Sequence, residues 1–128
     1  MEFVSVRVIT SDVERLAAFW EQVTGLPATR PAPVFAELRT PAGTIAIGAP
    51  ATVGILGDAA PAPGQNHSVI VELRVDDVDA ARERIAGLAA EIVLEPTDMP
   101  VLPITGTSRR AWRSGFQCTV HLPFGPLG

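Results

Sequence analysis

Two short segments carry polar side chains at matching places in a repeated pattern. Ser5 and Arg7 alternate along "VSVRVIT", and Ile70 and Glu72 stand at the same places in "VIVELRV", 65 residues later. Alternate side chains of a strand share a face. If the two copies are related by pseudo-symmetry, a cleft is expected between their sheets. Arg7 and Glu72 would then both face this cleft. They could form an internal ion pair that holds the halves together, provide a charged contact for a polar ligand, or stay solvated.

A third segment, "VFAELRT", places Phe35, Glu37 and Arg39 on one face of an expected strand. Phe35 could stack on a ligand, or it could be an ordinary aromatic residue of the core. Trp20, in the helical segment before it, is expected to pack a helix on the sheet.

Few other residues could do chemistry. His67 lies next to a Pro- and Gly-rich linker and is better explained as a turn residue than as a ligand. Cys118 and His121 are an odd number of residues apart, so on a strand they would lie on opposite faces and would not form a nucleophile pair. Three neighbouring carboxylates resemble a metal cluster, but the preference of helix N-termini for acidic residues explains them better. They are Asp76, Asp77 and Asp79.

The elements that must position these residues form one unit used twice. Residues 3–10 alternate as a strand. A helix is expected to begin at Ser11, because Ser11 and Glu14 match the S-x-x-E capping box. Gly25 supplies a left-handed stop, and Pro27 prevents the helix from continuing.

Short strands follow the first helix. Residues 34–40 and 43–49 are expected to form a hairpin, and residues 52–57 are a third, weaker strand candidate. Residues 58–66 read as a linker because they are rich in Pro, Ala and Gly.

The second copy then repeats the first. Residues 67–75 are expected to be a strand, and Asp76 is the expected N-cap, with Asp79 at the N3 position. A helix from Val78 to Leu88 and a strand at residues 90–96 complete the pattern.

Composition limits the class of protein. The 128 residues, 47% of them apolar and 19% charged, are typical of one globular domain. The net charge of −4 disfavours a nucleic-acid partner. The single cysteine excludes an internal disulfide. No apolar run approaches the roughly 18 residues of a membrane span, and the start does not read as a signal peptide, so a cytoplasmic protein is expected.

The two copies together resemble the vicinal oxygen chelate superfamily, which includes glyoxalase I, bleomycin-resistance proteins, fosfomycin-resistance enzymes and extradiol dioxygenases. The segments that carry the resemblance are "SVRVITSDVERLAAFWEQVTGLP" and "VIVELRVDDVDAARERI". In that family a strand leads into Asp-Val or Asp-Leu, and a helix with Phe-Tyr then ends in Leu-Gly. Here Phe19-Trp20 stands in place of Phe-Tyr. The resemblance covers residues 1–100.

The superfamily's metal-ligand positions do not hold ligands in this chain. The resemblance places the first ligand of each half seven residues before the helix-starting Asp, which gives Ser5 and Ile70. A serine hydroxyl is a poor ligand for a divalent metal, and isoleucine is none. The third ligand of the family is a late Glu, but no acidic residue follows Asp98. We therefore expect no catalytic residue, no metal and no cofactor.

Residues 101–128 depart from the family pattern. They contain no acidic residue and carry Arg109, Arg110 and Arg113. Three explanations are open: a divergent tail that keeps its strands, a basic surface for a partner, or a shifted reading frame after about Met99.

The predicted fold is α+β, with two repeated β-α-β-β-β modules forming curved mixed sheets around a cleft. The single domain spans residues 1–128, with modules at 1–57 and 67–128. We expect a homodimer that binds neither nucleic acid nor membranes. Its expected function is metal-free binding of a small, partly apolar molecule, including sequestration of a toxic or antibiotic-like compound. The predicted cleft residues are Ser5, Arg7, Phe35, Glu37, Ile70, Glu72 and Trp112.

Two other classes of function are open. One is a metal-dependent lyase, isomerase or transferase of the same superfamily, for which Glu37, Glu72 and His67 are the best remaining ligand candidates. The other is a pseudo-enzyme that works as an interaction or dimerisation module.

Overall fold

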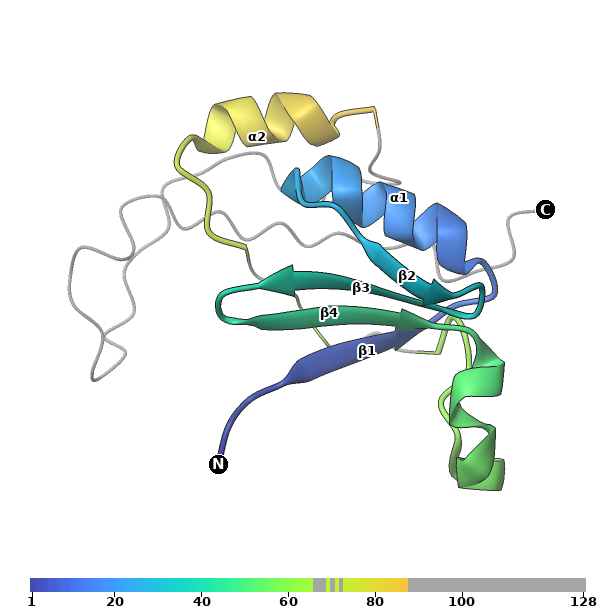
Figure 1. Ribbon diagram of the computed structural model, residues 1–128. Helices are drawn as coiled ribbons and strands as arrows, with labels where there is room; N and C mark the ends of the chain where they lie inside the picture. The colour runs from blue at the N-terminus through green and yellow to red at the C-terminus, as the bar shows by residue number, and fades with distance from the viewer. Residues whose placement is uncertain (66–68, 70, 72, 88–128) are drawn as a thin grey trace. The chain divides into compact units, whose positions relative to one another are not determined.

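The computed structural model describes residues 1–65, 69, 71 and 73–87. These residues belong to two compact units, the first made of residues 1–65 and the second of the others. The first unit contains a four-stranded sheet and a long helix, and the second contains one helix (Figure 1). Within the described residues, none of the helices is long and apolar enough to cross a membrane.

The sheet of the first unit is mixed, with its last strand in a central position. Its strands are β1 (Ser5–Ile9), β2 (Thr29–Ala32), β3 (Phe35–Thr40) and β4 (Gly43–Gly48). Their spatial order is β1-β4-β3-β2. Strand β4 pairs in parallel with β1 and antiparallel with β3. The predicted α+β class is confirmed. The first unit contains three of the four predicted strands, β1, β3 and β4, but its other strand is β2 and not the predicted segment 52–57.

Helix α1 (Val13–Thr24) begins one residue later than the capping box predicts. The N-cap is Asp12, not Ser11, and its carboxylate accepts a hydrogen bond of 3.0 Å from the backbone N–H of Arg15. Thr10 in turn accepts one from the backbone N–H of Asp12 through its hydroxyl. The carboxylate suits the positive end of the helix dipole better than a hydroxyl does. The predicted stop at Gly25 is confirmed, because its φ is 72° and its N–H donates to the carbonyl of Glu21.

The core of the first unit lies between α1 and the sheet, because α1 packs on β3 and β4. Trp20, only 2% exposed, lies in this layer as predicted and meets Phe19 edge to face, with ring centroids 5.6 Å apart. The sheet contributes Leu38 and Ile47, both fully buried. Val6 of β1 also points to this side, since it pairs with Ile45, but it is exposed at the sheet edge.

Strand β2 was not predicted, and a charge cluster ties it to α1. It contains Pro31, which an edge strand tolerates because one side of its backbone needs no partner. Arg30 on this strand binds Glu14 with two hydrogen bonds of 2.8 Å. It also binds Glu21 with hydrogen bonds of 3.0 and 3.1 Å. The two glutamates are two helical turns apart on α1, so one guanidinium reaches both.

This cluster shifts the ionisation of its members. Hydrogen bonds from the Arg30 side chain and, to a lesser extent, from the Ala28 N–H lower the pKa of Glu21 to about 2. The hydrogen bonds to Glu21 and Glu14 in turn raise the pKa of Arg30. Arg30 and Glu21 are both about one-third exposed, so solvent screens the pair.

The segment predicted as a third strand, residues 52–57, is instead part of the 3₁₀ helix η1 (Pro50–Ala59). Pro50 starts it with a φ suited to a helix. The hydroxyl and the N–H of Thr52 both donate to the carbonyl of Ala49. Val53 is the residue that η1 buries, while Ile55 is exposed. In Figure 1, η1 follows β4 and lies on the side of the sheet away from α1.

The described helix of the second unit is α2 (Val78–Ile85). Its N-cap is Asp77 rather than the predicted Asp76, and the Asp77 carboxylate accepts a hydrogen bond of 2.9 Å from the backbone N–H of Ala80. The same cap thus occurs at Asp12 and Asp77, at equivalent places in the two sequence copies. The predicted helix end at Leu88 and the strand at 90–96 lie outside the described residues.

Truncating the core under α1 tests the packing. Leu38→Ala should lower the free energy of unfolding by about 3 kcal/mol, because it leaves a cavity beside buried neighbours. Chemical denaturation measures the change. Ile55→Ala removes as much side chain at a position 97% exposed and should change stability by no more than about 0.5 kcal/mol. Equal effects of the two substitutions would show that the core lies elsewhere.

Acid titration tests the cluster at Arg30. The pKa of Glu21 lies below its ordinary value of 4.5, so its contribution is complete above pH 4.5 and is lost as the pH falls towards 2. The difference in unfolding free energy between wild type and Glu21→Gln should therefore shrink over that interval. In an Arg30→Gln background this pH dependence should be much weaker. Equal slopes in both backgrounds would contradict the assigned cause.

Candidate functional site

The candidate site is the face of the sheet that points away from α1, here called the polar face. Side chains alternate along each strand, and the register aligns them in rows across β1, β4 and β3. In the central row Arg7 is paired with Ala46, which is paired with Glu37. The polar face comprises Ser5, Arg7 and Ile9 of β1, Thr44, Ala46 and Gly48 of β4, and Phe35, Glu37 and Arg39 of β3.

Small side chains on β4 separate larger ones on its two neighbours. Thr44, Ala46 and Gly48 alternate with the bulky Ile45 and Ile47, which face α1. Ala46 is only 2% exposed, whereas Arg7 on the adjacent strand is exposed. Functional groups from β1 and β3 can therefore approach one another over a central strand that presents little bulk of its own.

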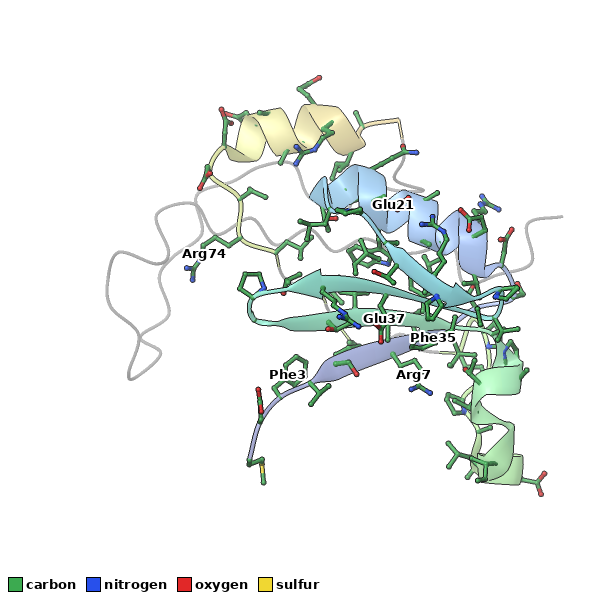
Figure 2. The ribbon with its side chains drawn as sticks, in the orientation of Figure 1. Phe3, Arg7, Glu21, Phe35, Glu37 and Arg74 are labelled. Carbon is green, nitrogen blue, oxygen red and sulfur yellow. The ribbon has the colours of Figure 1, made fainter. Side chains whose placement is uncertain are left out.

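Arg7 and Phe35 meet over this central strand although they belong to different strands. The Cζ atom of Arg7 lies 5.3 Å from the centroid of the Phe35 ring, which is a cation–π contact. Figure 2 shows both side chains on the side of the sheet away from α1. The part of the chain that the structure describes offers Arg7 no carboxylate partner. The ring thus orients a guanidinium whose N–H groups are available for hydrogen bonds.

Glu37 has a cationic partner on its own strand. Its Oε2 accepts hydrogen bonds of 3.0 Å and 3.3 Å from Arg39, two residues further along the same face. The Glu37 side chain is 24% exposed and that of Arg39 is 73% exposed. The positive charge of the more exposed Arg39 therefore partly balances the negative charge of Glu37.

The far end of the polar face is closed by η1. A Cβ atom added at Gly48 would lie 2.5 Å from Oγ1 of Thr52, so glycine is required for the approach of this segment. Ile9, which pairs with Gly48 at this end of the sheet, is buried, and so is Val53 of η1. The opposite end, with Ser5 and Arg39, is exposed.

The described residues of the polar face do not fit a divalent metal at the position of Ser5. The groups that share the face with this hydroxyl are two guanidinium groups, the Thr44 hydroxyl and a carboxylate already bound to Arg39. Divalent metals prefer anionic oxygen, imidazole or thiolate ligands. Among residues 1–65, 69, 71 and 73–87, no cluster of three His, Cys, Asp or Glu side chains could hold a metal ion.

The structure brings four of the seven predicted cleft residues onto one face: Ser5, Arg7, Phe35 and Glu37. The other three, Ile70, Glu72 and Trp112, lie outside the described residues. An ion pair of Arg7 with Glu72, one of the three roles considered for these residues, is therefore not tested. His67, Cys118, His121 and the atypical residues 101–128 are also outside the described residues. Asp77 caps the N-terminus of α2, which agrees with the interpretation of the acidic residues at 76, 77 and 79 as helix N-terminal residues, although Asp76 was the predicted cap.

Sequence reasoning missed the contribution of β4. Thr44, Ala46 and Gly48 carry no chemistry that a motif would reveal, yet they let Arg7 approach Phe35. Their signal in the sequence is the alternation of small and bulky residues in "TIAIG". The alternation on β3 places Arg39 and Glu37 on the same face, and the structure shows that they are bound to each other.

Comparison with known proteins gives one family and two similar structures. The model of a family described as "Glyoxalase-like domain" matches residues 4–103. The crystal structure of a glyoxalase/bleomycin resistance protein/dioxygenase family enzyme from Burkholderia phytofirmans PsJN is similar with a TM-score of 0.61 and 23% identity, over 77% of this chain and 82% of that one. The solution structure of protein ATC0852 from Agrobacterium tumefaciens is similar with a TM-score of 0.56 and 14% identity, over 77% and 80% of the two chains. A comparison with curated proteins gives no match.

A substitution at Gly48 tests how η1 closes the polar face. Gly48→Ala should lower the free energy of unfolding by about 1–3 kcal/mol, because the new methyl group overlaps the Thr52 hydroxyl. Thr52→Ala should have a smaller effect in the Gly48→Ala background than in the wild type, since it removes the overlapping atom. Gly54→Ala is the control, as no atom lies within 4 Å of the added methyl group. Additive effects at positions 48 and 52 in denaturation experiments would rule out the contact.

Proposed function

The chain belongs to the glyoxalase-like domain family, and from this premise we propose that it binds a small, partly apolar molecule on the polar face without a metal ion. The observation that carries the proposal is the contact of Arg7 with Phe35 beside the small residues of β4. Binding sites for small molecules combine apolar surface with a few convergent polar groups. The polar face offers both within three adjacent strands.

Binding of this kind requires no catalytic residue. Phe35 supplies a flat apolar surface, and Arg7 and the hydroxyls of Ser5 and Thr44 supply polar contacts. Such a site suits sequestration of a toxic or antibiotic-like compound, and we include this role in the proposal. A homodimer and a cytoplasmic location are also part of it.

The metal-dependent alternative has less support from the described residues. Glu37, one of its three candidate ligands, is held by Arg39 at 3.0 Å. A metal ion would have to displace this guanidinium and would also face Arg7 nearby. The other two candidates, Glu72 and His67, lie outside the described residues.

Binding to the full chain can be mapped by NMR with small aromatic and aliphatic compounds. Saturable shifts should appear at backbone amides of β1, β3 and β4, because the polar face is built from these strands. Ser5→Trp should weaken the binding at least about tenfold, since the indole would fill space beside Arg7. Ser11→Trp makes the same change at an exposed position before α1 and should have no effect.

Elemental analysis of the purified protein completes this test. We expect less than stoichiometric metal, and added Zn²⁺, Ni²⁺ or Mn²⁺ should not change the affinity for the compounds. A near-stoichiometric metal content, or shifts confined to residues away from the polar face, would contradict the proposal.

A further inference from the structure

We infer that the ligand of the polar face is an organic anion, with a carboxylate bound by Arg7 and a flat apolar body next to Phe35. This inference rests on the proposed function and specifies the chemical class of its ligand. The charged side chains of the polar face are two arginines and one glutamate. The face therefore carries a net positive charge, although the whole chain carries −4.

The two arginines of this face have different roles. Arg39 is bound to Glu37 by two hydrogen bonds, so its charge is compensated by its neighbour. Arg7 has no such partner in the part of the chain that the structure describes. Among the described residues, the positive charge of the polar face that lacks a carboxylate partner is therefore the one on Arg7.

The contact with Phe35 prepares Arg7 for this role. The Arg7 guanidinium contacts the Phe35 ring through a cation–π interaction, which does not use its N–H groups as hydrogen-bond donors. A carboxylate can accept two parallel hydrogen bonds from these N–H groups. Contact with the ring favours side-chain conformations of Arg7 that lie beside Phe35, which reduces the conformational entropy lost when the anion binds.

A cationic ligand is unsuitable because the carboxylate of Glu37 is already paired with Arg39. Oε2 of Glu37 already accepts hydrogen bonds from Arg39, so a cation would have to compete with that pair and would also meet the positive charge of Arg7. Two hydroxyl groups, Ser5 and Thr44, stand in the adjacent row and can donate further hydrogen bonds to an anion. A ligand with one negative charge matches the one positive charge that has no carboxylate partner among residues 1–65, 69, 71 and 73–87.

Three probes with the same ring and different charges test the inference on the full chain: 2-naphthoate, 2-naphthamide and 2-naphthylmethylammonium. NMR titration of the wild type should give a Kd for 2-naphthoate about tenfold lower than that for 2-naphthamide, as a charge-assisted hydrogen-bonded pair provides. The ammonium probe should bind most weakly. This comparison needs no variant and so does not depend on whether a variant folds.

Two matched variants then identify the arginine. Arg7→Gln should abolish the preference for 2-naphthoate over 2-naphthamide, because it removes the charge that distinguishes the two probes. Arg15→Gln makes the same charge change at an exposed position on α1 and should keep the preference. Phe35→Leu should reduce the affinity for 2-naphthoate. It should also reduce the preference for 2-naphthoate over 2-naphthamide without abolishing it, because Arg7 would keep its charge and lose its contact with the ring.

The outcomes separate this inference from the proposed function. If the acid and the amide bind the polar face equally, or if the ammonium probe binds best, the ligand class is wrong and the binding function stands. If Arg15→Gln removes the preference as fully as Arg7→Gln, general electrostatic attraction explains it and the role of Arg7 is wrong. If none of the probes causes saturable shifts on the polar face, both the ligand class and the site are overturned.

Discussion

The pairing of β4 with strands on both of its sides is the constraint on which the rest of the first unit depends. Parallel pairing with β1 and antiparallel pairing with β3 fix which side chains share a face in three strands at once. A shift of one residue in either pairing would turn every side chain of that strand to the other face. Ile45 and Ile47 would then leave the layer under α1, and the loss of their burial makes such a shift unfavourable.

The two faces of the sheet place opposite demands on β4. The side under α1 requires bulky apolar residues, because Trp20, Leu38 and Ile47 must fill a close-packed layer. The polar face requires small residues, so that Arg7 can approach Phe35 and Thr52 can approach Gly48. The alternating sequence "TIAIG" satisfies both demands in one strand. Packing on one side and the arrangement of charged groups on the other are therefore linked through the same backbone.

Local signals in the sequence predicted the elements that depend on them. The strands β1, β3 and β4, helix α1 and the stop at Gly25 all follow from alternation, helical spacing and the left-handed preference of glycine. The caps at Asp12 and Asp77 were placed one residue early, because Ser11 and Asp76 also match N-cap preferences and only backbone geometry distinguishes them. Strand β2 was missed because Pro31 argues against a strand unless the strand is known to lie at an edge. The segment at 52–57 was misread because its apolar residues suit a strand, whereas Pro50 and the hydrogen bonds of Thr52 produce a 3₁₀ helix.

By itself, the sequence determined the strand and helix that open the first unit, the family resemblance and the shared face of Ser5 and Arg7. These features depend on residue types and on spacing within one segment. It could not determine that Arg7 meets Phe35, that Glu37 is bound to Arg39 or that Arg30 joins two glutamates of α1. The contacts of Arg7 and Arg30 join segments far apart in the chain. Alternation along β3 puts Phe35, Glu37 and Arg39 on one face, but it does not say which of these side chains bind each other. Only the tertiary structure decided them, since strand order and register set which side chains come within reach of one another.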